Sequence, residues 1–142
     1  MTLPYGLGRL PSPFDARDLR MADAMQRMTP APRPVRLWHS DRVLNQGKTS
    51  RCVGYSWAGW GIADPVEDKW TNCMGDSIYR ECAILDGSPG YEGGSTVRTG
   101  AKVMAKRGRL ATYFFARTVD EALNYLAYYG TVVAGTVWTQ DM

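Results

Sequence analysis

Gln46 and Cys52, in the stretch LNQGKTSRCVGYSWAGW at residues 44–60, are the residues best suited to do chemistry. A cysteine is a nucleophile as its thiolate, and the free N–H groups at a helix N-terminus stabilise that anion. A backbone N–H at the same helix start and an upstream side-chain amide can bind the oxyanion of a tetrahedral intermediate. The stretch therefore fits acyl transfer by Cys52 with Gln46 as oxyanion donor. It fits a buried structural cysteine at a helix start equally well.

The other metal-binding or catalytic side chains do not form a second candidate site. The sequence has three cysteines and one histidine, without a Cys-x-x-Cys pair or a Cys/His spacing typical of zinc. We therefore expect no metal ion and no cofactor. His39, beside Trp38, is typical of a packed or surface residue. Cys82 lies at helical spacing from Ile78 and is predicted to be a small core residue.

Composition indicates one globular domain. The chain has 142 residues, of which 44% are hydrophobic and 22% charged. The net charge of +3 is mild, and a small basic group at 106–109 favours a solvated helix end over a nucleic-acid surface. The sequence has no apolar run of about 18 residues that would span a membrane. It also lacks the basic start and apolar stretch of a secretion signal, so we expect an intracellular protein with reduced thiols.

Two segments are predicted to differ in character. Residues 1–36 contain six prolines and should form an extended arm across the surface, with a short helix within 15–28. Residues 37–142 should form one domain in which helices precede strands. Periodicity and capping residues predict helices in 52–63, 74–87, 93–108 and 118–130, and dense Thr, Val and aromatic residues predict strands at 109–115 and 131–138.

Capping residues fix the expected starts of the last two helices. Ser95 is the predicted N-cap of the third. Thr118 and Glu121 form a capping box at the start of the fourth. The predicted buried face of that fourth helix consists of Val119, Ala122, Leu123 and Leu126.

Three stretches together resemble the papain-like cysteine peptidases, closest to their bacterial and phage branch. They are Gln46-Gly47 with Cys52 six residues after the glutamine, GYEGGSTVRTGAKVMAKRG at 90–108, and EALNYLAYYGTVVAGTVW at 121–138. The second is similar to the family's glycine-pair loop and following helix, and the third to the helix and strand that open its barrel. The resemblance covers about residues 36–142. It implies an α+β fold in which a helical half precedes the start of an antiparallel β-barrel.

The resemblance also implies roles for individual residues. Cys52 would be the nucleophile and Gln46 the oxyanion-hole amide. Gly93 and Gly94 match the glycine pair that binds an extended substrate backbone, and Val133 would border a substrate side-chain pocket. From the residues alone, the glycines fit a simple turn before a helix nearly as well.

The chain departs from the family pattern in two ways. The family's general-base histidine and its Asn or Asp partner follow the first barrel strands, and residues 1–142 hold no histidine after His39. Thr49 stands where many members have a disulfide cysteine, which fits a reducing compartment. We therefore expect the base on residues beyond 142, and an unpaired edge at the strand 131–138.

Two functions follow from these observations. One is a thiol hydrolase acting on a peptide or protein through a thioester at Cys52. The other is an inactive papain-fold structural or binding module, such as a phage virion component that contacts other virion subunits. We expect no nucleic acid and no membrane as partners, and a location in the cytoplasm of a bacterium or infected host, or in a virion. We also expect Cys52 to react with iodoacetamide faster than Cys73 or Cys82.

Overall fold

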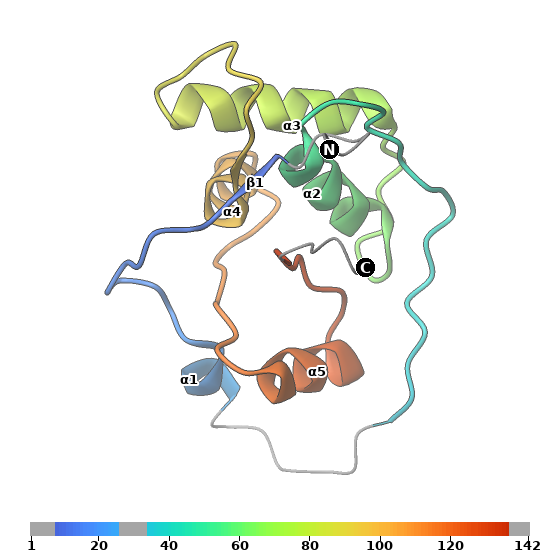
Figure 1. Cartoon of the computed structure of the whole chain (residues 1–142). Helices are drawn as coiled ribbons and strands as arrows, with labels where there is room; N and C mark the ends of the chain where they lie inside the picture. The colour runs from blue at the N-terminus through green and yellow to red at the C-terminus, as the bar shows by residue number, and fades with distance from the viewer. Residues whose placement is uncertain (1–7, 26–33, 137–142) are drawn as a thin grey trace, which may run out of the picture.

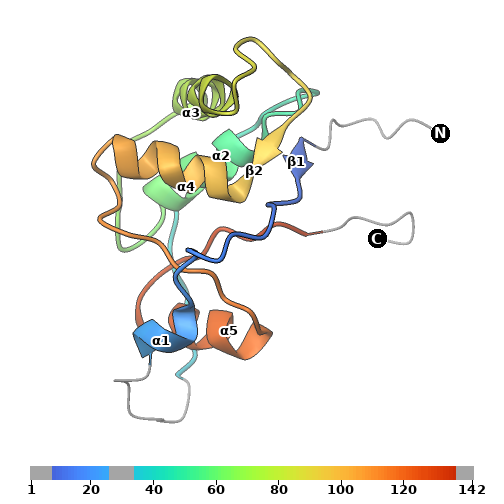
Figure 2. The same ribbon diagram turned by 90° about the vertical axis from the view of Figure 1, so that its left-hand side faces the viewer.

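The computed structural model describes residues 8–25 and 34–136. Over these residues the chain has an α+β fold of helices with one small parallel sheet. Figures 1 and 2 show the arrangement from two sides. The elements are β1 (Arg9–Leu10), α1 (Met21–Met25), α2 (Cys52–Ile62), α3 (Asn72–Leu85), β2 (Ser95–Thr96), α4 (Val97–Lys106) and α5 (Val119–Tyr128).

Helix α2 is the centre of the core, with α3 and α4 packed against it (Figure 1). Gly54 lets α2 and α3 approach closely, because a Cβ there would overlap the carbonyl oxygen of Gly75. Cys82 is fully buried at this contact, as the sequence predicts. The buried side chains of the core cluster are Val53, Trp57, Ala58, Ile78, Cys82, Ala101, Val103 and Met104.

The predicted N-cap of α4 is wrong by one residue. The side chain of Thr96, not Ser95, accepts the hydrogen bond from the Thr99 N–H, at 3.0 Å. Ser95 is instead buried, and its hydroxyl donates to Asp86 Oδ2 at 2.7 Å. The Thr96 side chain thus caps the helix, while the Ser95 side chain binds Asp86.

The two strands are parallel and lie far apart in sequence. Arg9 of β1 pairs with Ser95 of β2, and Leu10 pairs with Thr96. The predicted antiparallel barrel start is therefore wrong for the described residues. Residues 109–115 and 131–136 form no strand, and in this region only Phe115 makes a bridge, to Arg20. Thr- and Val-rich segments become strands only where a neighbour pairs their backbone groups over several residues, and in the described part of these segments the pairing is limited to Phe115. Residues 137 and 138 lie outside the described part.

Helix α5 lies with α1 at the end of the molecule away from α3 (Figures 1 and 2). Its predicted N-cap is confirmed, because Thr118 Oγ1 accepts from the Glu121 N–H at 3.2 Å. The Glu121 carboxylate accepts from the N–H of Arg117, one residue before the cap, at 2.9 Å. Its predicted buried face is partly wrong. Val119 is 74% exposed and Leu123 43% exposed. Local capping residues are enough to start this helix. In the described structure the core does not cover Val119 and Leu123 on the side that was predicted to be buried.

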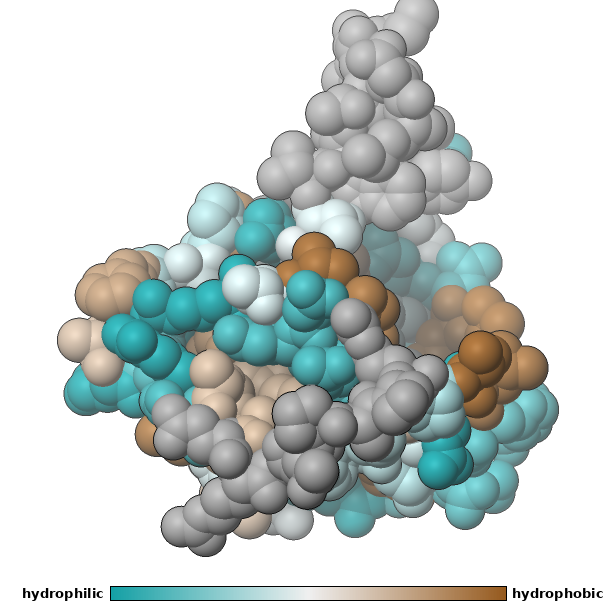
Figure 3. All heavy atoms as spheres, turned by 90° about the horizontal axis from the view of Figure 1, so that it is seen from below, coloured by the Kyte–Doolittle hydropathy of each residue, from teal (hydrophilic) through white to brown (hydrophobic). Residues whose placement is uncertain are grey.

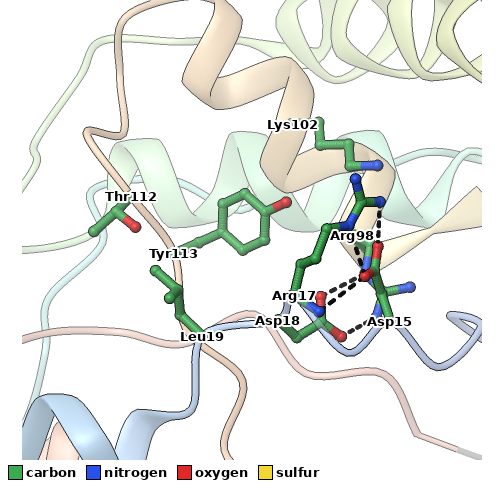
Figure 4. Close-up of a pocket in the computed structure, with 8 residues that line it drawn as sticks. All are labelled: Asp15, Arg17, Asp18, Leu19, Arg98, Lys102, Thr112 and Tyr113. Carbon is green, nitrogen blue, oxygen red and sulfur yellow. Dashed lines mark hydrogen bonds and ion pairs between the residues drawn. The ribbon is translucent and has the colours of Figure 1, made fainter.

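The described part of the arm crosses the surface as predicted, and Arg98 of α4 fastens it. The Arg98 guanidinium donates to both carboxylate oxygens of Asp18 (Figure 4). The same guanidinium donates to the carbonyl oxygen of Pro13. It also lies over the ring of Phe115. Two residues of the arm, Gly8 and Met21, are buried, so the arm contributes more than a surface layer.

The surface carries scattered apolar side chains. Seen from the α1–α5 end, they form separate groups among hydrophilic atoms (Figure 3). Over residues 8–25 and 34–136, every helix is too short or too polar to cross a membrane.

Candidate functional site

Cys52 is the first residue of α2, as the sequence predicts. Its side chain is half-buried. The backbone N–H groups of Gly8, Val53 and Cys52 itself favour the thiolate and so lower the pKa of the thiol. Burial is the larger effect, however, and the net result raises the pKa of the Cys52 thiol above its usual value. The expectation of a thiol activated by its helix is therefore not met in this arrangement.

Gln46 lies in the turn that leads into α2. Its side-chain amide donates to the Thr49 carbonyl oxygen at 3.0 Å, and the Thr49 hydroxyl donates to the Gln46 carbonyl at 2.8 Å. The turn is completed by the Gly47 N–H, which donates to Asn45 Oδ1 at 2.8 Å. These bonds hold the amide in a fixed position. An amide group can serve an oxyanion only if it is held in place in this way.

Gln46 and Cys52 line the same surface groove, of about 570 Å³. The groove runs along one side of α2, past Tyr55, Ser56 and Gly59. The structure thus brings together the two residues that the sequence singled out. Both could contact one ligand bound in the groove.

Gly94 directly precedes β2, and neither Gly93 nor Gly94 is among the described residues that line the groove. Gly94 has a φ of +108°, which disfavours any residue with a Cβ, and its N–H donates to the Tyr79 hydroxyl at 3.0 Å. A Cβ on Gly94 would overlap the carbonyl of Gly8 in the arm. Gly93 instead lies against the side chain of Tyr91. The residue after Gly94, Ser95, donates its N–H to the Gly8 carbonyl at 2.7 Å.

Val133 is half-buried and packs against the core cluster. Among the described residues it is not part of the groove lining. Its predicted role at a substrate pocket therefore has no contact with Cys52 to support it.

His39 lies apart from the thiol. It is exposed, and its backbone pairs with Asp64 through two hydrogen bonds of 2.9 and 3.0 Å. The described residues that line the groove include no imidazole. The site therefore holds a thiol and an amide donor, but no side chain that could take the thiol proton near neutral pH.

Comparison with protein families, curated proteins and solved structures gave no match.

Sequence reasoning missed two residues next to the thiol. Arg51 directly precedes Cys52 and is bound by Asp76 at 2.8 Å and by Glu92 at 2.7 Å, which raises the pKa of its guanidinium. Gly8 belongs to an arm that was predicted to lie away from the core. No local sequence pattern indicates the contacts of Arg51 with its carboxylates or of the arm with β2, because the contacting residues are 25 or more positions apart in the sequence. Within the described ranges, no group of three acidic, Cys or His side chains could hold a metal ion.

The three thiols should label in an order that differs from the sequence-based expectation. We expect iodoacetamide to modify exposed Cys73 first, half-buried Cys52 second and buried Cys82 last. Burial raises the pKa of Cys82 to about 12, so its thiolate is scarce at any mild pH. Because the pKa of Cys52 is also raised, its labelling rate should still increase above pH 9.

Mass spectrometry of tryptic peptides after timed quenching measures the three rates separately. Labelling in urea, where all three thiols are exposed, is the control and should remove the differences. If native Cys52 reacts fastest at pH 7, the balance between burial and the helix N–H groups given above is wrong.

Proposed function

We propose that this chain carries the thiol half of a papain-like cysteine peptidase site. In this proposal Cys52 is the nucleophile, Gln46 is the oxyanion amide, and the backbone beside Gly94 binds an extended peptide. The imidazole that completes the reaction comes from residues outside 1–142. The substrate is a peptide or protein, and the reaction is acyl transfer to Cys52.

One observation carries the proposal: Cys52 and Gln46 line one groove, with α2 starting at the thiol. The backbone N–H groups of Val53 and Cys52 at this helix start favour the thiolate, although burial outweighs them. The same groups and the Gln46 amide are the donors that an oxyanion forming near Cys52 requires. A cysteine that served only to fill space in the core needs none of these.

The second candidate is a papain-fold binding or structural module, for example one that contacts other subunits of a virion. Two observations favour it. Burial raises the pKa of the Cys52 thiol, and no imidazole lies among the described lining residues of the groove. In this case Cys52 is a residue of the binding surface.

A peptide carrying a vinyl sulfone separates the two candidates. The reagent alkylates a thiol that binds its peptide part, and a general base is less critical than for amide hydrolysis. We expect the ratio of vinyl sulfone to iodoacetamide labelling to be higher at Cys52 than at exposed Cys73. Gln46→Ala should lower that ratio at Cys52 and leave Cys73 unchanged.

The variant Cys52→Ser is the control that assigns the label to Cys52. Its intact mass after labelling should lack the increment that wild type gains at this residue. Equal ratios at Cys52 and Cys73 would mean that exposure alone governs labelling. That result would contradict the peptidase proposal and favour the binding module.

A further inference from the structure

Residues 8–10 of the arm lie on the edge of the site as a bound peptide would. They are extended and pair in parallel with β2, with the Gly8 carbonyl accepting from the Ser95 N–H at 2.7 Å. Figure 2 shows β1 side by side with β2 at the start of α4. The contact is made largely by backbone groups, which any extended peptide carries.

Gly8 occupies the narrowest part of this contact. It is buried between the segment that leads into α2 and the backbone of Gly94. A Cβ on residue 8 would overlap the carbonyl group and the Cα of Ser50. These are backbone atoms two residues before Cys52, so they cannot move aside as the end of a flexible side chain would. Only glycine fits at this point.

The same residue lies next to the thiol. The Gly8 N–H favours the Cys52 thiolate, while the Gly8 carbonyl accepts from the Ser95 N–H at 2.7 Å. The backbone of one peptide residue thus faces both the thiol and β2. Arg9, the next residue, lies against the backbone of Gly135.

We propose that the β2 edge beside Cys52 is a binding site for an extended peptide with glycine at the position facing Ser50. In this chain residues 8–10 fill that site and shield the thiol. The proposal rests on the peptide-binding part of the proposed function and adds its selectivity. A peptide with any side chain at this position is excluded by the backbone of Ser50.

The first arm of the test removes the resident segment in the full-length chain. Gly8→Val should displace it, and Cys52 should then react with iodoacetamide about 5- to 150-fold faster, the factor that corresponds to the usual cost of overpacking. Phe14→Leu is the matched control, because Phe14 is in the same arm but outside residues 8–10 and is 81% exposed, so the labelling rate of Cys52 should match wild type. An unchanged rate in Gly8→Val would overturn the proposal.

The second arm adds peptides to the Gly8→Val variant, where no tethered segment competes. The octapeptide YGLGRLPS, which is residues 5–12, should slow Cys52 labelling, and YGLARLPS should not. Labelling of Cys73 should be the same with both. Protection by both peptides would overturn the glycine requirement, and protection by neither would overturn the peptide site.

Labelling of buried Cys82 reports whether the variant is folded. If Gly8→Val exposes Cys82, the milder Gly8→Ala takes its place in both arms. Protection by a peptide depends only on its binding beside Cys52. It does not depend on acyl transfer or on reaction of the thiol with the vinyl sulfone.

Vinyl sulfone labelling is therefore measured in Gly8→Val as well, because the resident segment blocks the site in wild type. In that variant, selective protection by the glycine peptide without selective vinyl sulfone labelling would contradict the peptidase proposal alone. The reverse result would contradict the glycine site alone.

Discussion

Arg98→Met should lower the free energy of unfolding by about 3–5 kcal/mol, the usual cost of removing one partner from a buried ion pair. Arg98 is only 8% exposed. Its partner Asp18 has a side chain that is 16% exposed, and it would keep its charge without a counterion. The Pro13 carbonyl would lose its donor as well. Urea denaturation followed by circular dichroism measures the change.

The loss of stability in Arg98→Met should depend on the charge of Asp18. In the double variant Arg98→Met with Asp18→Asn the orphaned charge is gone, so the loss should be smaller than the sum of the two single losses. Arg109→Met is the matched control, because Arg109 pairs with Asp68 but its side chain is 38% exposed. Exposed pairs contribute about 0–1 kcal/mol. Equal losses for the two arginine variants would contradict the role given to Arg98.

The second large effect concerns turnover. We expect residues 1–142 to show no measurable hydrolysis of a fluorogenic peptide. General acid–base help accounts for about 10²–10⁴-fold of rate in such reactions. The described groove supplies no imidazole, and burial keeps the pKa of the Cys52 thiol raised, so little thiolate forms at neutral pH.

Two variants complete the turnover assay. His39→Ala should behave as wild type, because His39 is exposed and its backbone is paired with Asp64. Cys52→Ala should give the same background as wild type. Robust cleavage by wild type that is lost in both variants would make His39 the base and overturn our interpretation.

The helices were predictable because their signals are local. The start of α2 at Cys52, the N-cap at Thr118 and the burial of Cys82 follow from residues within a few positions of one another. The N-cap of α4 was missed by one residue, because Ser95 and Thr96 are both good capping residues and tertiary contacts decide between them.

The strands were not predictable from composition. Segments 109–115 and 131–136 have strand-like residues, but in the described chain only Phe115 makes a bridge to another segment. The strands that do form, β1 and β2, are two residues long, and β1 lies in an arm that the prolines mark as irregular. Strand formation here depends on a distant partner, which no local pattern reveals.

The candidate site was predictable in part. The order Gln46, turn, Cys52, helix placed both residues on one groove. The pKa of the thiol was not predictable in the same way, because it depends on how deeply the rest of the chain buries the sulfur. Gly8 was missed for the same reason, since its neighbours Ser50 and Gly94 come from later parts of the chain.

The pairing of β1 with β2 also determines when residues 8–10 can dock during folding. Arg9 and its partner Ser95 are 86 positions apart, the difference between 95 and 9. Such long-range contacts carry a loop-closure cost that local helix contacts avoid, and they form late in folding. During synthesis residues 8–10 emerge first, yet they can dock only after β2 has left the ribosome. Until then, residues 8–10 do not cover Cys52. The thiol at the start of α2 is therefore open to other molecules while the rest of the chain is being made.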